Sequence, residues 1–215
     1  MPARIPKSGT LPQSFSKNLI LTSDLSESMI IAVRKQLSSS LTTDPGVNVN
    51  FPTNEKIDSE MLRLAMRQWA TGVTIVTSAF KGKQHGMTVS SFTSVSLVPP
   101  LVLVSIERVV RTHELVSQSG VFGVSILSEE HQQISDRFAG RESELEDRFK
   151  GLQTLTLETG APLLYDGLAN FDCTVVGQHE AGSHSLFIGQ VVAVRVGNSG
   201  KPLVYYDRQY RRLKE

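Results

Sequence analysis

One stretch of the chain combines many side-chain hydroxyls with apolar residues, a combination that could bind a polar ligand. Val89, Phe92 and Val95 interrupt six Ser and Thr residues between Gly86 and Pro100, namely Thr88, Ser90, Ser91, Thr93, Ser94 and Ser96. Because a buried polar group without a partner costs ~1–3 kcal/mol, these hydroxyls cannot all face a dry core. They suit an anionic or carbonyl-rich partner such as a phosphate. The alternative is a Ser- and Thr-rich edge strand that faces water.

A second candidate anion site lies where a loop is expected to become a helix. Arg111 and Thr112 precede the helical segment that includes Leu115 and Val116. Exposed amides at a helix start, a guanidinium and a hydroxyl together can bind a phosphate. The alternative is that Arg111 is a solvated surface charge.

Several common catalytic patterns are absent from the sequence. It has no Gly-x-Gly-x-x-Gly, P-loop, His-Glu-x-x-His or Gly-x-Ser-x-Gly motif, and its five histidines lack zinc-ligand spacing. No two carboxylates stand out as an acid–base pair, so we expect no metal site and no essential catalytic acid or base. A polar, hydroxyl-rich site without a nucleophile suits a cofactor that carries the chemistry itself.

Composition excludes several other classes. The 215 residues include 22 basic and 21 acidic side chains, a net charge of +1 that favours neither nucleic acid nor an anionic membrane. Cys173 is the single cysteine, so no internal disulfide is possible. No apolar run reaches the ~18–20 residues of a membrane span. We therefore expect a cytoplasmic protein with no nucleic-acid or membrane partner.

The elements that must position these residues fall into two parts. Residues 1–55 read as an N-terminal extension, partly disordered, with an amphipathic helix at about 24–41 that packs on the domain or on a dimer partner. Residues 56–215 read as a mainly β domain with flanking helices. Its expected helices lie at about 58–70, with Trp69 in the core, after Arg111, and at 129–138. Its expected strands lie at 73–77, 101–106 (with 101–104 fully buried), 120–127, 169–177, 185–194 and 202–210, and the stretch 86–100 is the return strand of the first hairpin. Residues 142–150 read as a solvated charged run.

The order of these motifs resembles the short-chain flavin reductases. The run from Gly86 to Ser105 looks like the signature of that family, and further motifs follow in order between Met61 and Leu213. The resemblance implies an antiparallel FMN-binding split β-barrel. It implies reduction of free FMN or FAD by NADH or NADPH, and delivery of the reduced flavin to a partner monooxygenase. Pairing of two copies to complete the flavin sites would make the protein a homodimer.

The same resemblance implies roles for particular residues. Residues 88–91 and 105–107 would face the isoalloxazine, with Ser90, Ser91, Ser94, Arg111 and Thr112 near the ribityl-phosphate and Phe138-Ala139-Gly140 beside the flavin. The flavin-binding residues are thus Thr88, Val89, Ser90, Ser91, Ser94, Ser105, Ile106, Glu107, Arg111, Thr112, Phe138 and Ala139. His184 and Tyr210 would lie on the nicotinamide side. Ser183 stands where the family usually has Asp, so the carboxylate that could fix the His184 imidazole is missing.

Two other functions fit the same barrel. One is a flavin-binding or redox-sensing module without nicotinamide turnover. The other is an FMN enzyme like pyridoxamine-phosphate oxidase, which would need a basic substrate pocket. His184 and the closing Tyr210 favour the reductase.

Overall fold

The computed structural model describes residues 57–141, 147–197 and 199–214. The chain divides into two units, Met1–Asn50 and Phe51–Glu215, and every described residue belongs to the second. The expected helix at about 24–41 lies outside the described residues. The elements of the second unit are α2 (Ser59–Met66), β1 (Thr71–Gly72), β2 (Thr74–Phe80), β3 (Lys83–Val89), β4 (Thr93–Leu97), β5 (Pro100–Glu107), α3 (Arg111–Ser119), β6 (Val121–Ile126), η1 (Glu129–His131), α4 (Gln132–Phe138), β7 (Thr154–Leu155), β8 (Leu163–Leu164), β9 (Ala169–Ala181), β10 (His184–Val196), β11 (Val204–Tyr206) and β12 (Gln209–Arg211).

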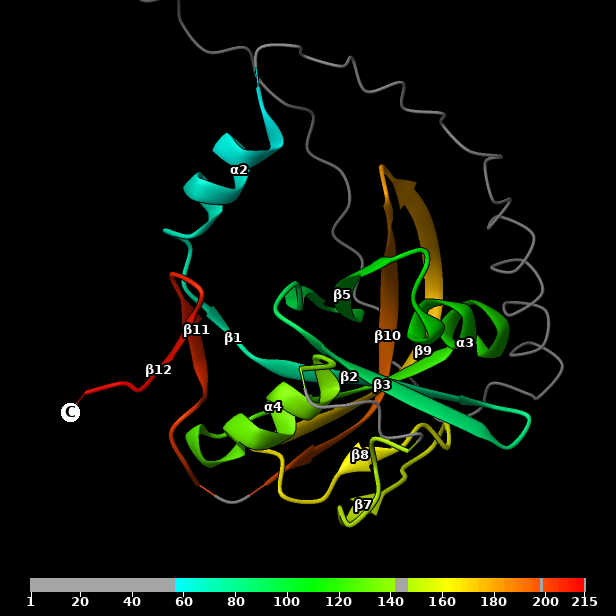
Figure 1. The fold of residues 1–215 in the computed structure, drawn as a ribbon. Helices are drawn as coiled ribbons and strands as arrows, with labels where there is room; N and C mark the ends of the chain where they lie inside the picture. Colours follow the sequence, from blue (N-terminus) through cyan, green and yellow to red (C-terminus); the bar gives the residue numbers. More distant parts are fainter. Residues whose placement is uncertain (1–56, 142–146, 198, 215) are drawn as a thin grey trace, which may run out of the picture. The chain divides into compact units, whose positions relative to one another are not determined.

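A seven-stranded antiparallel sheet forms the centre of this unit (Figure 1). Its strand order is β3-β2-β6-β9-β10-β5-β4, and a small sheet, β1-β11-β12, lies apart from it. The longest strands are β9 and β10, which form a hairpin around the turn at Gly182 and Ser183. The mainly β, antiparallel class expected from the sequence is confirmed.

The hydroxyl-rich stretch is two strands rather than one. β3 ends at Val89 and β4 begins at Thr93, so Ser90 to Phe92 form the break between them. β3 pairs with β2 and β4 pairs with β5, which places the two strands at opposite edges of the sheet. Three residues span only about 10 Å, so residues 90–92 link two edges of the sheet that lie close together.

Two expectations about burial were wrong. Residues 101–104 were expected to form a fully buried stretch, but β5 alternates, with Val102, Val104 and Ile106 buried and the residues between them half-buried. Trp69 was expected in the core, but its side chain is 67% exposed, and α2 has no buried residue. α2 also ends at Met66, before the expected Ala70, and the chain after it is held by an ion pair of 2.7 Å between Arg67 and Asp207.

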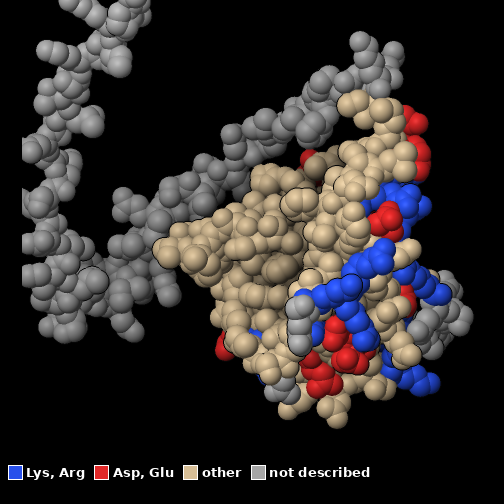
Figure 2. Space-filling view, turned by 90° about the vertical axis from the view of Figure 1, so that its left-hand side faces the viewer, with Lys and Arg blue, Asp and Glu red and all other residues tan. Residues whose placement is uncertain are grey.

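The outer face of β10 carries a row of exposed valines. Val192, Val194 and Val196 alternate with half-buried residues along the strand. Exposed apolar residues continue on edge strand β4 and the turn that follows it, at Val95, Leu97 and Val98. In the view of Figure 2, the charged side chains gather along one side of the molecule and leave a broad surface without charge.

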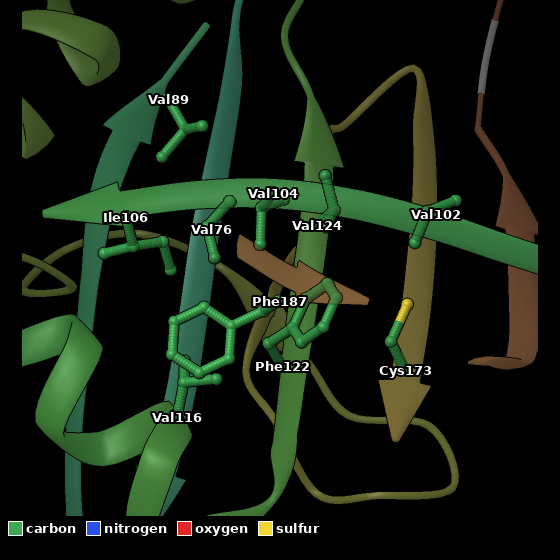
Figure 3. Close-up of a cluster of buried hydrophobic side chains, with 10 residues drawn as sticks. All are labelled: Val76, Val89, Val102, Val104, Ile106, Val116, Phe122, Val124, Cys173 and Phe187. Atoms are coloured by element: carbon green, nitrogen blue, oxygen red, sulfur yellow. The ribbon is translucent and has the colours of Figure 1, made fainter. Parts of the chain in front are cut away.

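The inner face of the sheet carries the main hydrophobic core (Figure 3). β5 and α3 supply Ile106 and Val116, and the rings of Phe122 and Phe187 meet between the strands. A second cluster lies under α4, where Phe138 packs edge-on against Phe149 with ring centroids 5.2 Å apart. The second cluster fixes α4 against β3, beside the hydroxyl-rich stretch.

Candidate functional site

Two of the hydroxyls in the hydroxyl-rich stretch are satisfied by the protein itself. Thr88 donates a hydrogen bond of 2.6 Å to the carbonyl oxygen of Ser135 in α4. Ser91 donates to the carbonyl oxygen of Ser105 at 2.8 Å and accepts from its backbone N–H at 3.2 Å. These hydroxyls join neighbouring elements, so a ligand is not needed to explain them. Ser90 and Ser94 are exposed and can still meet a ligand.

Two cavities meet at Ser90. The larger, of about 430 Å³, is called here the Trp69 cavity and is lined by Trp69, Ala70, Thr71, Gly72, Thr74, Ser90, Ser91, Phe92, Thr93 and Ile126. The smaller, of about 180 Å³, is called the Tyr210 cavity and is lined by Val73, Thr88, Ser90, Ala139, Arg141, Tyr205 and Tyr210. The break between β3 and β4 therefore forms a wall of both cavities. Trp69 was not expected among the site residues. Its side chain lines the larger cavity instead of packing in the core, which is why the core prediction was wrong.

A hydrogen-bond network holds Tyr210 in the smaller cavity. Its hydroxyl donates to the carboxylate of Asp136 at 3.0 Å and lies 2.9 Å from Ser135 Oγ. Arg141 bonds the same carboxylate oxygen at 2.8 Å, and its guanidinium carbon lies 5.6 Å from the centre of the Tyr210 ring. Burial raises the pKa of Tyr210, and the hydrogen bond to Asp136 raises it further. The phenol is therefore a protonated, fixed wall of the cavity.

The start of α3 brings together the second set of predicted residues. Arg111 is the first residue of the helix and is exposed, whereas Thr112 is buried and lies 2.7 Å from His85 Nδ1 on β3. Val110, at the N-cap, offers no side-chain hydrogen bond to the helix amides. This arrangement keeps the helix start open to a ligand.

Arg148 also reaches this region, although it falls in the charged run predicted to be solvated. Its Nη1 donates to the carbonyl oxygens of Gly86 at 3.0 Å and Phe138 at 2.8 Å. Burial lowers the pKa of its guanidinium, and the charge of Arg111 lowers it further. Burial also lowers the pKa of His85 to about 4, with smaller contributions from Arg148 and Arg111. The imidazole is therefore neutral at neutral pH.

The remaining predicted residues differ in what they leave open to a ligand. The side chains of Val89, Ile106 and Phe138 are buried in the two core clusters. Ser105 is engaged with Ser91 through its backbone. Glu107 and Ala139 are exposed, and Ala139 lines the Tyr210 cavity.

His184 lies apart from Tyr210. It is the first residue of β10 and pairs with Glu107 of β5, and it lines neither cavity. Its Nδ1 lies 2.9 Å from the hydroxyl of Ser183, the residue that stands in place of the usual acid. The two residues predicted for the nicotinamide side are thus not brought into one cavity within a single copy of the described chain.

The donor set fits a phosphate-bearing flavin better than a metal. No group of three or more His, Cys, Asp or Glu side chains in the described part of the chain could hold a metal ion. Hydroxyls, helix-start amides and guanidinium groups are the donors that phosphates and flavin carbonyls accept. No helix among the described residues is long and apolar enough to cross a membrane.

Comparison with known proteins identifies the family. The model of the flavin reductase like domain matches residues 66–214. An NADH-dependent flavin reductase of Rhodococcus sp is 41% identical over 156 residues, covering 71% of this chain and 85% of that protein. HsaB of Rhodococcus jostii (strain RHA1), described as the reductase subunit of a flavin-dependent monooxygenase, is 35% identical, covering 73% of this chain and 78% of that protein.

A solved structure shows the same fold. The flavin reductase PheA2 in its native state superposes with a TM-score of 0.68 at 38% identity, covering 74% of this chain and 100% of that one. The antiparallel split barrel predicted from the sequence is the fold of this chain. The chain belongs to the family of flavin reductase-like domains.

Proposed function

We propose that the protein reduces free FMN or FAD with NADH or NADPH and supplies the reduced flavin to a partner monooxygenase. The observation that carries this proposal is the pair of cavities around Ser90, lined by hydroxyl-bearing and aromatic side chains, in a member of the flavin reductase-like family. A relative with 41% identity is named for NADH-dependent flavin reduction, and another is named as a monooxygenase reductase subunit.

The residues of this chain would bind and orient the reactants. A bound dihydronicotinamide would supply the hydride that reduces the flavin. Holding two rings in contact at the right angle lowers the barrier without an acid or a base. Backbone groups of residues 88–91, 106 and 107 would hydrogen-bond the flavin ring, with Ser90 and Ser94 offering exposed hydroxyls.

Tyr210 and His184 would serve the nicotinamide side. The hydrogen bond from Tyr210 to Asp136 holds its ring at the wall of the smaller cavity. His184 lies at the end of β10, where a second substrate could approach from solvent. Within one copy, the Tyr210 cavity has no His184 in its lining. A second copy of the chain could place its own His184 there.

We also propose that the working form is a homodimer. The exposed apolar residues of β10, β4 and the turn after β4 form the surface for the second copy, called here the valine face and consisting of Val95, Leu97, Val98, Val192, Val194 and Val196. β4 is an edge strand, and an uncovered apolar edge is prone to associate. A self-complementary patch of this kind suits two-fold pairing.

The decisive experiment is anaerobic reduction of FMN and FAD by NADH and by NADPH, with catalytic amounts of the protein. We expect many turnovers with at least one flavin and one nucleotide. Tight flavin binding without nucleotide oxidation would instead identify a carrier or sensor. Oxidation of pyridoxamine phosphate would identify the oxidase alternative. A mixture with a flavin-dependent monooxygenase then tests delivery of the reduced flavin through product formation.

A further inference from the structure

The small sheet β1-β11-β12 contributes to the walls of both cavities. Residues 69–72 run into β1 and line the Trp69 cavity. Tyr205 of β11 and Tyr210 of β12 line the Tyr210 cavity. Thr71 pairs with Tyr205, and Tyr205 pairs with Tyr210, so one short ladder joins the two walls. A shift of this sheet would therefore change the shape of both cavities.

Three polar contacts, called here the hairpin latch, fasten the β11–β12 hairpin to the chain just before Trp69. Arg67 Nε donates to the carboxylate of Asp207 at 2.7 Å, and the Asp207 N–H donates to the carbonyl oxygen of Arg67 at 3.1 Å. The Tyr206 hydroxyl donates to the side-chain oxygen of Gln68 at 3.1 Å. The ion pair joins residues 140 positions apart in the sequence, so it fixes the position of the hairpin rather than a local turn.

The turn that carries Asp207 has an uncommon conformation for its residues. Asp207 and Arg208 have φ values of +48° and +61°, and neither residue is glycine. Two positive φ values suit the twist of a two-residue hairpin turn, but they favour Gly, Asn or Asp over a residue such as Arg. Such a conformation persists where the surrounding structure holds it. The half-buried ion pair between Asp207 and Arg67 supplies such a contact.

The latch can act on a ligand only through the cavity walls, because neither Arg67 nor Asp207 lines either of the two cavities. Each partner of the ion pair is close along the chain to one aromatic wall residue, Arg67 to Trp69 and Asp207 to Tyr210. β1 pairs with β11 at only two positions, so strand pairing alone holds the hairpin weakly. The position of Tyr210 relative to Trp69 therefore depends on the latch.

We propose that Arg67 and Asp207 are positioning residues, whose ion pair holds Tyr210 and Trp69 in place so that nucleotide and flavin fit side by side. The proposal rests on the proposed function for the identity of the two ligands. Without the ion pair, the hairpin must be ordered when the ligands bind, and that ordering weakens binding. The latch should therefore affect how tightly the nucleotide is held more than the hydride step.

Steady-state oxidation of NADH with FMN tests the proposal. Asp207→Asn removes the charge and keeps a residue that tolerates a positive φ. We expect it to raise the KM for NADH about three- to tenfold, the scale of a lost half-buried charged contact, with kcat changed less than about twofold. Arg67→Gln should have the same effect, and Arg67→Lys, which keeps the charge, should lie between Arg67→Gln and the parent.

Arg63→Gln is the matched control, because the ion pair of Arg63 with Glu60, at 3.3 Å, lies within α2. It should leave the KM unchanged. A Tyr210→Leu background shows whether the latch acts through Tyr210. In that background, Asp207→Asn should raise the KM less than about 1.5-fold further. An equal rise in both backgrounds, or a fall in kcat with unchanged KM, would overturn the proposal.

The fluorescence of Trp69 reports on the other wall without any turnover, because Trp69 is the single tryptophan of the chain. Quenching of its emission by FMN should require about threefold more FMN in Asp207→Asn than in the parent or in Arg63→Gln. Unchanged quenching would overturn the assignment of Trp69 to the latch. A parent that shows quenching by FMN but does not oxidise NADH would refute the proposed function instead, and quenching in the variants would then decide the role of the latch.

Discussion

At the scale of single residues, His184 offers the sharpest test of the nicotinamide side. Its imidazole has a hydroxyl, Ser183, where the family pattern places a carboxylate, so it can contribute a hydrogen bond or a ring contact. We expect His184→Ala to lower kcat/KM for the nucleotide, by a factor that corresponds to ~1–2 kcal/mol of lost transition-state stabilisation. Flavin affinity should stay unchanged. Stopped-flow reduction across nucleotide concentrations measures this. An unchanged concentration dependence would return His184 to a structural role.

His85 should make the fold sensitive to acid. Its pKa is lowered to about 4 in the folded protein, against about 6.5 in an unfolded chain. Between these values the unfolded state binds more protons, so stability falls as the pH falls from 6.5 toward 4. We expect a loss of ~1 kcal/mol between pH 7 and 5, after discounting for the partial exposure of the ring. Urea unfolding at both pH values should show a smaller loss in His85→Gln, and an equal loss would contradict the assignment.

The chemistry of single residues could be predicted from the sequence only in part. Arg111 and Thr112 could be placed at a helix start because helical spacing follows them. The position of Arg148 could not be predicted, because the charged run around it gives no sign that its side chain turns inward to two carbonyls. The sequence signal for an inward turn was the neighbouring Phe149, an apolar residue within the charged run, which is buried in the structure. The hydroxyls of Thr88 and Ser91 were expected to need a ligand, but backbone carbonyls satisfy them.

At the scale of the elements, the β9–β10 hairpin depends on a glycine at a close approach. A Cβ at Gly189 would overlap the ring of Phe122, which is fully buried in the main core. We expect Gly189→Ala to destabilise the protein by ~1–3 kcal/mol, because the close-packed ring cannot move aside freely. The measurement is the free energy of unfolding in urea.

Gly177→Ala is the matched control in the same hairpin. Its Cβ would meet Ile188 Cδ1 at 3.5 Å, which is ordinary contact. We expect a change of less than ~0.5 kcal/mol there. Equal effects of the two substitutions would show that the cost lies in the backbone conformation rather than in the contact with Phe122.

Local pattern indicated most strands correctly, because alternating and buried apolar runs are local features. The strands at 73–77, 120–127 and 169–177 correspond to β2, β6 and the first part of β9. What local pattern did not give was how far each strand continues or where it breaks. β9 extends to Ala181 through a charged and polar end, and the hydroxyl-rich stretch divides between opposite edges of the sheet. The end of β9 is held by pairing with β10 across the turn, and the opposite edges follow from the strand order of the whole sheet.

At the scale of the whole molecule, the valine face is the feature that a single copy leaves unexplained. Leu97, Val98 and Val196 are at least 80% exposed, and no described element covers them. The register of β10 with β5 ends with Gln190 opposite Leu101, which places the turn after β4 next to the exposed end of β10. Residues from separate parts of the sequence thus contribute to the proposed contact surface, which the sequence alone did not show.

We expect a carboxylate on this face to separate the two copies. Val194→Glu and Leu97→Glu would each bury an unpaired charge at the proposed contact, so each should weaken the dimer at least about 100-fold, by ~3 kcal/mol or more. Met61→Glu is the control, because Met61 is 60% exposed in α2 and lies outside the valine face and both cavities. Sedimentation equilibrium at micromolar concentration measures the association. If the pairing completes the flavin site, the two disruptive variants should also lose flavin affinity, whereas the control keeps both. A parent protein that is a stable monomer with flavin bound would refute the pairing outright, because the valine face would then be open to water in the working form.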